Sequence, residues 1–230
     1  FAKYRFGFYR NGCKGSCFFY FMQRFSLKNC NFAEIMKKIK SVAVYCASST
    51  KIDECYFEAA RRLGVILAQN NIVCYNGGGG IGLMGALSDA VIENGGKAIG
   101  VIPQFMCDMG WGHSSLSDLI VVETMHERKA VMAENADAVV ALPGGIGTLE
   151  EFFEILTWKQ LGLFPKPIVL LNTNGFYDDI LAHLNKAVAQ NFMRVQHTEM
   201  WSTVTLPEQI LPAMANAVEW GADLRKMAKV

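Results

Sequence analysis

The chain has 230 residues, a formal net charge of +1 and 51% hydrophobic residues, enough for one compact α/β domain with a sizeable core. The small net charge gives no basis for nucleic acid binding driven by bulk charge, and no apolar run approaches the roughly 20 residues that span a bilayer. Seven cysteines without paired C-x-x-C spacing argue against a disulfide framework and against a structural zinc site. We therefore expect a metal-free enzyme in a reducing cytoplasm.

Residues 1–35 differ from the rest of the chain. They carry eleven aromatic residues and six Lys or Arg, with no acid before Glu34, and they follow neither a period of 2 nor one of 3.6. Such a segment could touch a membrane surface or an acidic partner, or precede a natural start at Met36. We expect a poorly ordered, non-catalytic arm, followed by one domain over residues 36–230.

From residue 40 onward, short apolar runs alternate with segments of helical spacing. The runs predict strands at 41–46, 72–75, 97–102, 119–122, 138–142 and 167–171. The spacing predicts helices at 52–69, 82–93, 125–135, 149–161, 176–191 and 207–226, with a long polar loop before residue 118. Alternating strands and helices indicate right-handed crossovers and a doubly wound parallel sheet with helices on both faces. Ligands of such sheets bind at the carboxyl ends of the strands.

The most informative stretch is AVVALPGGIGTLEE, residues 138–151. A buried strand stops at a glycine-rich turn, after which Thr148 is expected to cap a helix whose first turn holds Glu150 and Glu151. Free N–H groups at a helix start bind phosphate well, so acids at the same place suggest chemistry beside a phosphate. The alternative is that these acids only complement the helix dipole.

A second glycine-rich turn, residues 77–82, also joins a strand to a helix and matches G-x-G-x-x-G. A dinucleotide site needs an acid at the end of the next strand, but that strand ends Gly-Val-Ile-Pro at 100–103. The Lys and Ser/Thr of an NTPase phosphate loop are missing as well. A phosphate cradle formed by both glycine-rich turns is the remaining interpretation.

Three motifs carry a family resemblance: NGGGGIGLMGAL at 76–87, MHERKA at 125–130 and PGGIGTLEE at 143–151. Over residues 36–220 the chain resembles the LOG family of cytokinin riboside 5′-monophosphate phosphoribohydrolases, formerly described as possible lysine decarboxylases. The resemblance implies a Rossmann-like domain, usually a homodimer, that needs no cofactor. It would cleave the N-glycosidic bond of a nucleoside 5′-monophosphate, AMP among the substrates of some members.

The resemblance also implies roles for individual residues. Arg128 and Glu151 would be the catalytic pair, and the nucleotide and its phosphate would be bound by Gly78, Gly79, Gly80, Gly82, Met84, Lys129, Gly144, Gly145, Ile146, Gly147, Thr148, Leu149, Glu150 and Thr157. The chemistry agrees, because a carboxylate stabilises the oxocarbenium-like state of glycosidic cleavage. A guanidinium can bind phosphate or that carboxylate. The alternative for Arg128 and Lys129 is an ordinary solvated basic pair.

The chain departs from the family at Gly110, where many members have Glu, and at Ile146, where many plant members have Tyr. Asp108 or His113 could compensate for the missing acid. Lysine decarboxylation would need a Schiff-base lysine and pyridoxal phosphate, and no lysine is placed for that role, so we reject it. A non-catalytic nucleotide- or cofactor-binding module remains the rival, although such a module has no need of both Arg128 and Glu151.

Overall fold

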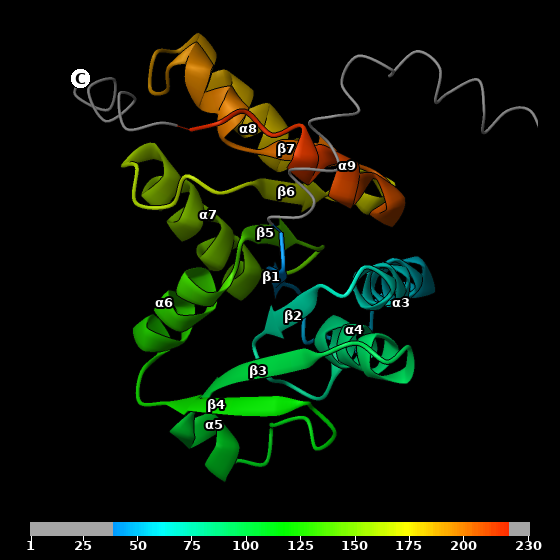
Figure 1. Ribbon diagram of the computed structural model, residues 1–230. Helices are drawn as coiled ribbons and strands as arrows, with labels where there is room; N and C mark the ends of the chain where they lie inside the picture. Colours follow the sequence, from blue (N-terminus) through cyan, green and yellow to red (C-terminus); the bar gives the residue numbers. More distant parts are fainter. Residues whose placement is uncertain (1–38, 221–230) are drawn as a thin grey trace, which may run out of the picture.

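The computed structural model describes residues 39–220, so the predicted arm at 1–35 lies outside the described residues. They form one parallel seven-stranded sheet with the order β4-β3-β2-β1-β5-β6-β7 (Figure 1). The strands are β1 (Ser41–Tyr45), β2 (Val73–Asn76), β3 (Ala98–Pro103), β4 (Asp118–Val122), β5 (Ala138–Ala141), β6 (Ile168–Leu171) and β7 (Ser202–Val204). The predicted fold class, a doubly wound parallel α/β sheet, is confirmed.

Helices cover both faces of the sheet (Figure 1). One layer contains α3 (Glu54–Gln69), α4 (Gly82–Glu93) and α9 (Ile210–Ala215), and the other contains α6 (Met125–Asn135), α7 (Ile146–Gln160) and α8 (Asp178–Ala189). A short helix, α5 (Gln104–Asp108), follows β3. No helix within residues 39–220 is long and apolar enough to cross a bilayer.

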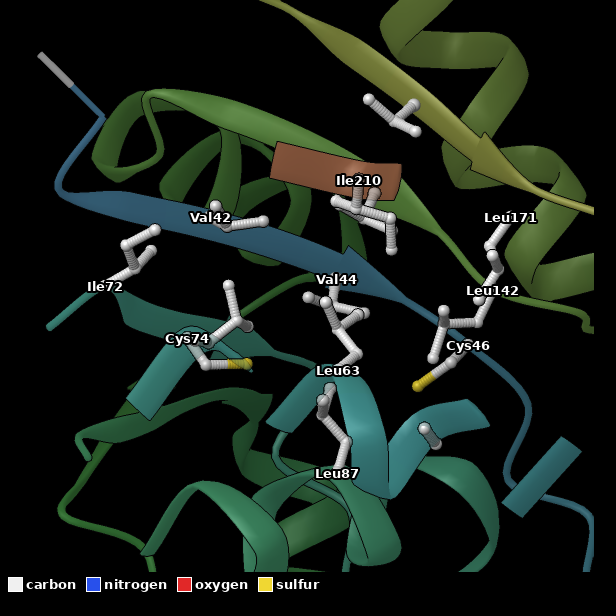
Figure 2. Packing of buried hydrophobic residues seen from close by; sticks show 14 of the residues in the cluster. Val42, Val44, Cys46, Leu63, Ile72, Cys74, Leu87, Leu142, Leu171 and Ile210 are labelled. Carbon is white, nitrogen blue, oxygen red and sulfur yellow. The ribbon is translucent and has the colours of Figure 1, made fainter. Parts of the chain in front are cut away.

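The central strand β1 shows why the core has two halves. Val42 and Val44 pack toward α3, α4 and α9 (Figure 2), whereas Ala43 and Tyr45 pack toward α6 and α7. Successive side chains of a strand point to opposite faces, so a strand buried on both sides is apolar throughout. The continuous apolar run at 41–46 therefore reflects burial under two helical layers.

The order of the strands places the ligand site. From β1 the chain builds the sheet in one direction through β2, β3 and β4, and it then returns to β1 to build β5, β6 and β7 on the other side. The carboxyl ends of β1 and β5 therefore flank the point where the strand order reverses. Open parallel sheets leave a crevice for ligands at such a switch point.

Several predicted elements need correction. The helix predicted at 207–226 is, in its described part, a 3₁₀ turn, Pro207–Gln209, followed by α9, which ends at Ala215; residues 221–226 lie outside the described residues. Residues 216–220 are not helical, and Trp220 is buried in the layer of α6 and α7, a position that requires the chain to leave the helix axis. The strand β7 has only three residues, too few to show a period in the sequence, and the predicted loop before residue 118 contains α5.

Candidate active site

A cavity of about 890 Å³ lies at the carboxyl ends of β1, β2, β3 and β5. Its walls come from the residues after β1 and β2, the loop 110–114, the first turn of α6 and the first turns of α7. These are the strand ends at the switch point of the sheet, where the topology predicts a ligand. The cavity thus unites the two glycine-rich turns with the MHERKA segment.

The turn between β5 and α7 differs in detail from the prediction. The helix begins at Ile146 with Gly145 as the N-cap residue, so Thr148 lies inside the helix, and the first turn contains no acid. A Cβ at Gly144 would lie 2.1 Å from Thr148 Oγ1. The buried threonine therefore folds back onto this glycine, which makes capping by Thr148 wrong and moves both acids one turn further along the helix.

The start of α7 leaves several backbone N–H groups without an acceptor among the described residues. The first N–H groups of a helix have no intrahelical acceptor, and within residues 39–220 no loop or side-chain acceptor takes the N–H of Gly145, Ile146 or Gly147. All three residues are exposed at the cavity, where Ile146 is 87% exposed. These N–H groups and the positive end of the dipole of α7 can hold a phosphate.

The turn between β2 and α4 uses its N–H groups differently. Gly78 N–H donates to Asn76 Oδ1 at 2.8 Å, and Gly80 N–H donates to the carbonyl of Trp111 at 3.2 Å. Gly78 is buried and Gly82, with φ +65°, packs against Ser48. The prediction that both turns direct N–H groups at one phosphate therefore needs correction, because Gly78 and Gly80 already have acceptors.

The predicted catalytic pair meets in the cavity wall. Arg128 lies one turn into α6, which Thr124 caps by accepting a hydrogen bond from Glu127 N–H at 3.1 Å. Arg128 Nη2 is 3.6 Å from Glu151 Oε1, and each side chain is only about 10% exposed. Burial raises the pKa of Glu151 to about 7, against the opposing effect of Arg128. A carboxylate with a pKa near neutrality is typical of a functional site.

Lys129 points away from the cavity. Its buried ammonium pairs with Glu150 and lies 3.1 Å from Glu154 Oε1, both on α7. Burial acts to lower the pKa of Lys129, but its hydrogen bonds to Glu150 and Glu154 outweigh burial, and the pKa is raised. Lys129 therefore joins α6 to α7 rather than lining the cavity, and it is not a solvated surface charge either.

Of the remaining predicted residues, some line the cavity and others do not. Gly79, Met84 and Glu150 line the cavity. Leu149 packs into the core layer of α6 and α7, and Thr157 is exposed outside the cavity, with its hydroxyl donating to the carbonyl of Phe153.

The structure also describes the loop around Gly110, where many family members have Glu. Gly110 lies on the cavity wall with φ +72°, a conformation that favours glycine. Asp108 accepts a hydrogen bond from Gln104 and lies outside the cavity lining. His113 does line the cavity, but Nδ1 accepts from Ser115 N–H and Nε2 lies 3.0 Å from Asp89 Oδ1. Both ring nitrogens of His113 are therefore engaged within the protein.

Sequence reasoning assigned no role to several residues that line the cavity, Cys46 and Trp111 among them. Gly77 was predicted as part of a phosphate-binding turn, whereas the structure places it against the Arg128 guanidinium. Cys46 could have been found from its place at the carboxyl end of the first strand, where ligands of a parallel sheet bind. Trp111 carried no such signal, because nothing in the sequence indicates that its loop folds onto the turn after β2.

The fold and the site define a class: a Rossmann-like α/β protein whose cavity combines an exposed helix start with a buried Arg–Glu pair. The family described as "possible lysine decarboxylase" matches residues 84–214, more than half of the chain. A cytokinin riboside 5′-monophosphate phosphoribohydrolase of Arabidopsis thaliana is 42% identical over 160 residues, covering 70% of this chain and 75% of that protein. The chain belongs to this family, the LOG family.

A second relative supports the family assignment, and a solved structure supports the fold. The enzyme of the same name from Rhodococcoides fascians is 44% identical over 155 residues, which is 67% of this chain and 78% of that protein. The molybdenum cofactor carrier protein of Chlamydomonas reinhardtii is similar in structure, with a TM-score of 0.58 at 21% identity over 76% of this chain and 95% of that one. At this identity the structural likeness shows the shared fold alone.

Proposed function

We propose that this protein hydrolyses the N-glycosidic bond of a purine nucleoside 5′-monophosphate, releasing the free base and ribose 5-phosphate. The observation that carries the proposal is the placement of Glu151, buried 3.6 Å from Arg128 on the same helix that opens its N-terminus to the cavity. A phosphate at the start of α7 brings the attached ribose toward Glu151. The names of the relatives support this reaction.

The chemistry follows from these two side chains. Cleavage passes through an oxocarbenium-like state, and an ionised Glu151 stabilises its positive charge. Water adds to the anomeric carbon and gives up a proton, while the electrons of the broken bond leave with the base, which is protonated. Arg128 favours the ionised form of Glu151 and offers donors to the substrate.

The base specificity is a finer part of the proposal. A Cβ at Gly110 would meet nothing within 4 Å, so the position where many relatives carry Glu is open space. Ile102, Met106 and Trp111 line this part of the cavity and provide apolar contact area for a base. We infer that both adenine and an N6-substituted adenine fit, which would make AMP a substrate. The homodimer and the cytoplasmic location remain predictions.

The test is direct. The protein is incubated with AMP and, separately, with isopentenyladenosine monophosphate, and the products are separated by chromatography. Free base and ribose 5-phosphate in equal amounts support the proposal. Tight binding of both nucleotides by calorimetry without any free base would identify the rival, a non-catalytic nucleotide-binding module.

A further inference from the structure

The turn after β2 holds a contact that the proposed reaction does not explain. Gly77 follows β2 directly, and the guanidinium of Arg128 lies against its backbone. A Cβ at this position would be 1.8 Å from Arg128 Nη2 and 2.9 Å from Cζ. Any side chain at Gly77 would therefore occupy the space of the guanidinium itself.

The requirement for glycine at this position is steric. Gly78 and Gly82 in the same turn have φ of +74° and +65°, but Gly77 is not among the residues with positive φ. An alanine can adopt such a backbone without strain. A Cβ at Gly77 would also lie 3.1 Å from Met84 Sδ, but its overlap with the Arg128 guanidinium is far more severe.

The turn has little freedom to move away from Arg128. The buried side chain of Asn76 donates to Ser88 Oγ on α4 and accepts from Gly78 N–H, both at 2.8 Å. On the other side, His113 N–H donates to the carbonyl of Gly78 at 2.9 Å. Gly77 is held between these anchors, so a Cβ there would displace the guanidinium and not the turn.

Hydrogen bonding holds the guanidinium only weakly. Arg128 Nη1 donates to Met125 Sδ at 3.7 Å, Nε is buried without an acceptor among residues 39–220, and the distance from Nη2 to Glu151 Oε1 is 3.6 Å, too long for a hydrogen bond. The orientation of Arg128 therefore depends on the surfaces that it contacts. The backbone of Gly77 is one of these surfaces, since the guanidinium fills the space that a Cβ there would need.

We propose that Gly77 is a positioning residue whose bare backbone forms the seat that holds the Arg128 guanidinium against Glu151. In this chain the first glycine-rich turn thus serves the catalytic pair, whereas the start of α7 takes the phosphate. The catalytic consequence rests on the proposed function, but the seat itself does not.

A thermal double-mutant cycle tests the seat without reference to activity. Gly77→Ala is made in the parent protein and in Arg128→Met, which keeps an apolar stem and removes the guanidinium. Overpacking a filled site is destabilising, so Gly77→Ala should lower the unfolding midpoint of the parent by about 3 °C or more. It should lower the midpoint of Arg128→Met by less than about 1 °C.

If Gly77→Ala lowers the unfolding midpoint equally in the parent and in Arg128→Met, the proposed seat is wrong. It is also wrong if Gly77→Ala lowers the midpoint of neither protein. If Gly77→Ala does not fold at all in the parent, folding of the double variant supports the proposal. Failure of the double variant as well, while Arg128→Met folds, refutes it.

Kinetics with AMP tests the catalytic consequence. Gly77→Ala should lower kcat/KM on the order of 30-fold or more, mainly through kcat, and should have less than about a twofold further effect in Arg128→Met. Gly112→Ala, on the facing loop, is the matched comparison, because no binding role is predicted for Gly112 and its Cβ would meet Leu119 Cδ2 at an ordinary 3.7 Å. Its loss of kcat/KM should be at least tenfold smaller than that of Gly77→Ala, and equal losses would show that crowding of this side of the cavity, not the seat, controls the rate.

The two proposals fail in different ways. If the parent cleaves neither nucleotide, the proposed function fails, while the thermal cycle still decides the seat. If the parent is active and the thermal effects of the two substitutions are additive, the seat is wrong and the proposed function stands.

Discussion

Glu151 is placed where its charge is useful for catalysis and unfavourable for folding. It is 8% exposed, and burial raises its pKa to about 7, while Arg128 at 3.6 Å opposes that rise. A carboxylate that faces a developing oxocarbenium contributes most when few waters screen it. The burial that destabilises the ionised form of Glu151 in the folded protein therefore strengthens its effect on the transition state.

The first prediction is the loss of this charge. Glu151→Gln should keep AMP binding but lower kcat on the order of a hundredfold or more, because the stabilising charge is gone. Glu150→Gln is the matched control. Glu150 is exposed and paired with Lys129, so its loss should be much smaller. If Glu151→Gln turns over AMP as fast as the parent, Glu151 has no catalytic role.

The second prediction concerns stability and pH. Since the pKa of Glu151 is raised from 4.5 to about 7 on folding, the folded protein keeps a proton between these values that the unfolded chain has released. Stability from this group therefore falls as the pH rises from 4.5 to 7. At pH 8 the free energy of unfolding of Glu151→Gln, measured by denaturant titration, should exceed that of the parent by about 1–3 kcal/mol. At pH 4 the two proteins should be equally stable. If the stability difference between Glu151→Gln and the parent were the same at pH 8 and pH 4, Glu151 would not titrate with a raised pKa in the folded protein.

The third prediction assigns Lys129 an electrostatic role through α7. Its charge lowers the pKa of Glu151, whereas Glu150 and Glu154, the two acids that it pairs with, raise it. Lys129→Met should therefore move the acidic limb of the kcat/KM profile to higher pH, and Lys129→Arg should leave it in place. The phosphate of AMP also ionises, near pH 6, but equally for every variant. If the acidic limb of the kcat/KM profile does not move in Lys129→Met, Lys129 has a packing role only.

At the scale of elements, α7 combines the two parts of the site. Its start presents free N–H groups at Gly145, Ile146 and Gly147, and Glu151 follows just over one turn later. A helix is rigid over this length, so a phosphate bound at the start fixes the distance of the sugar from the carboxylate. Remote binding energy of this kind appears in turnover as well as in affinity.

The fourth prediction is that the 5′-phosphate is required. Hydrogen bonds to a charged group contribute about 1.5–3 kcal/mol each, so losing two at the start of α7 costs about 3–6 kcal/mol, or roughly two to four decades in kcat/KM. AMP should be cleaved and adenosine hardly at all in one preparation. Equal kcat/KM values for the two would mean that α7 does not hold the phosphate.

Elements with a strong local pattern were predictable from the sequence. The helices at 82–93 and 125–135 have the predicted bounds, and the apolar runs became strands. The shortened α9 was missed because tertiary burial of Trp220 overrides the local pattern. Local propensity alone does not include such contacts.

The sequence predicted which residues form the site, but not in which direction their side chains and N–H groups point. Arg128 and Glu151 lie close together, as expected. Glu151 follows β5 at the switch point, whereas Arg128 lies on α6, the crossover from the edge strand β4 to β5. The acceptor for Gly80 N–H is Trp111, more than thirty residues away, so no motif could show that this donor was occupied. Lys129 follows Arg128 on α6 by about 100° around the helix, which directs it to α7 instead of the cavity.

At the scale of the whole molecule, the rim of the cavity is unusually apolar. Ile81, Trp111 and Ile146 line the cavity and are 61%, 51% and 87% exposed. Met132 on α6 and Ala136 just after this helix are fully buried in the core, so neither can face a partner. Exposed apolar groups gathered around a polar site mark an interface more often than a free surface.

The last prediction is that two copies of the chain meet at this rim and complete each cavity. Light scattering at micromolar concentration should give at least twice the 25.5 kDa of one chain, and specific activity should fall on dilution as the copies separate. Ile81→Lys places a charge at the rim of both copies, where like charges and lost apolar area oppose association. It should lower the mass and the activity together. A species of 25.5 kDa with full activity would show that one chain forms a complete site.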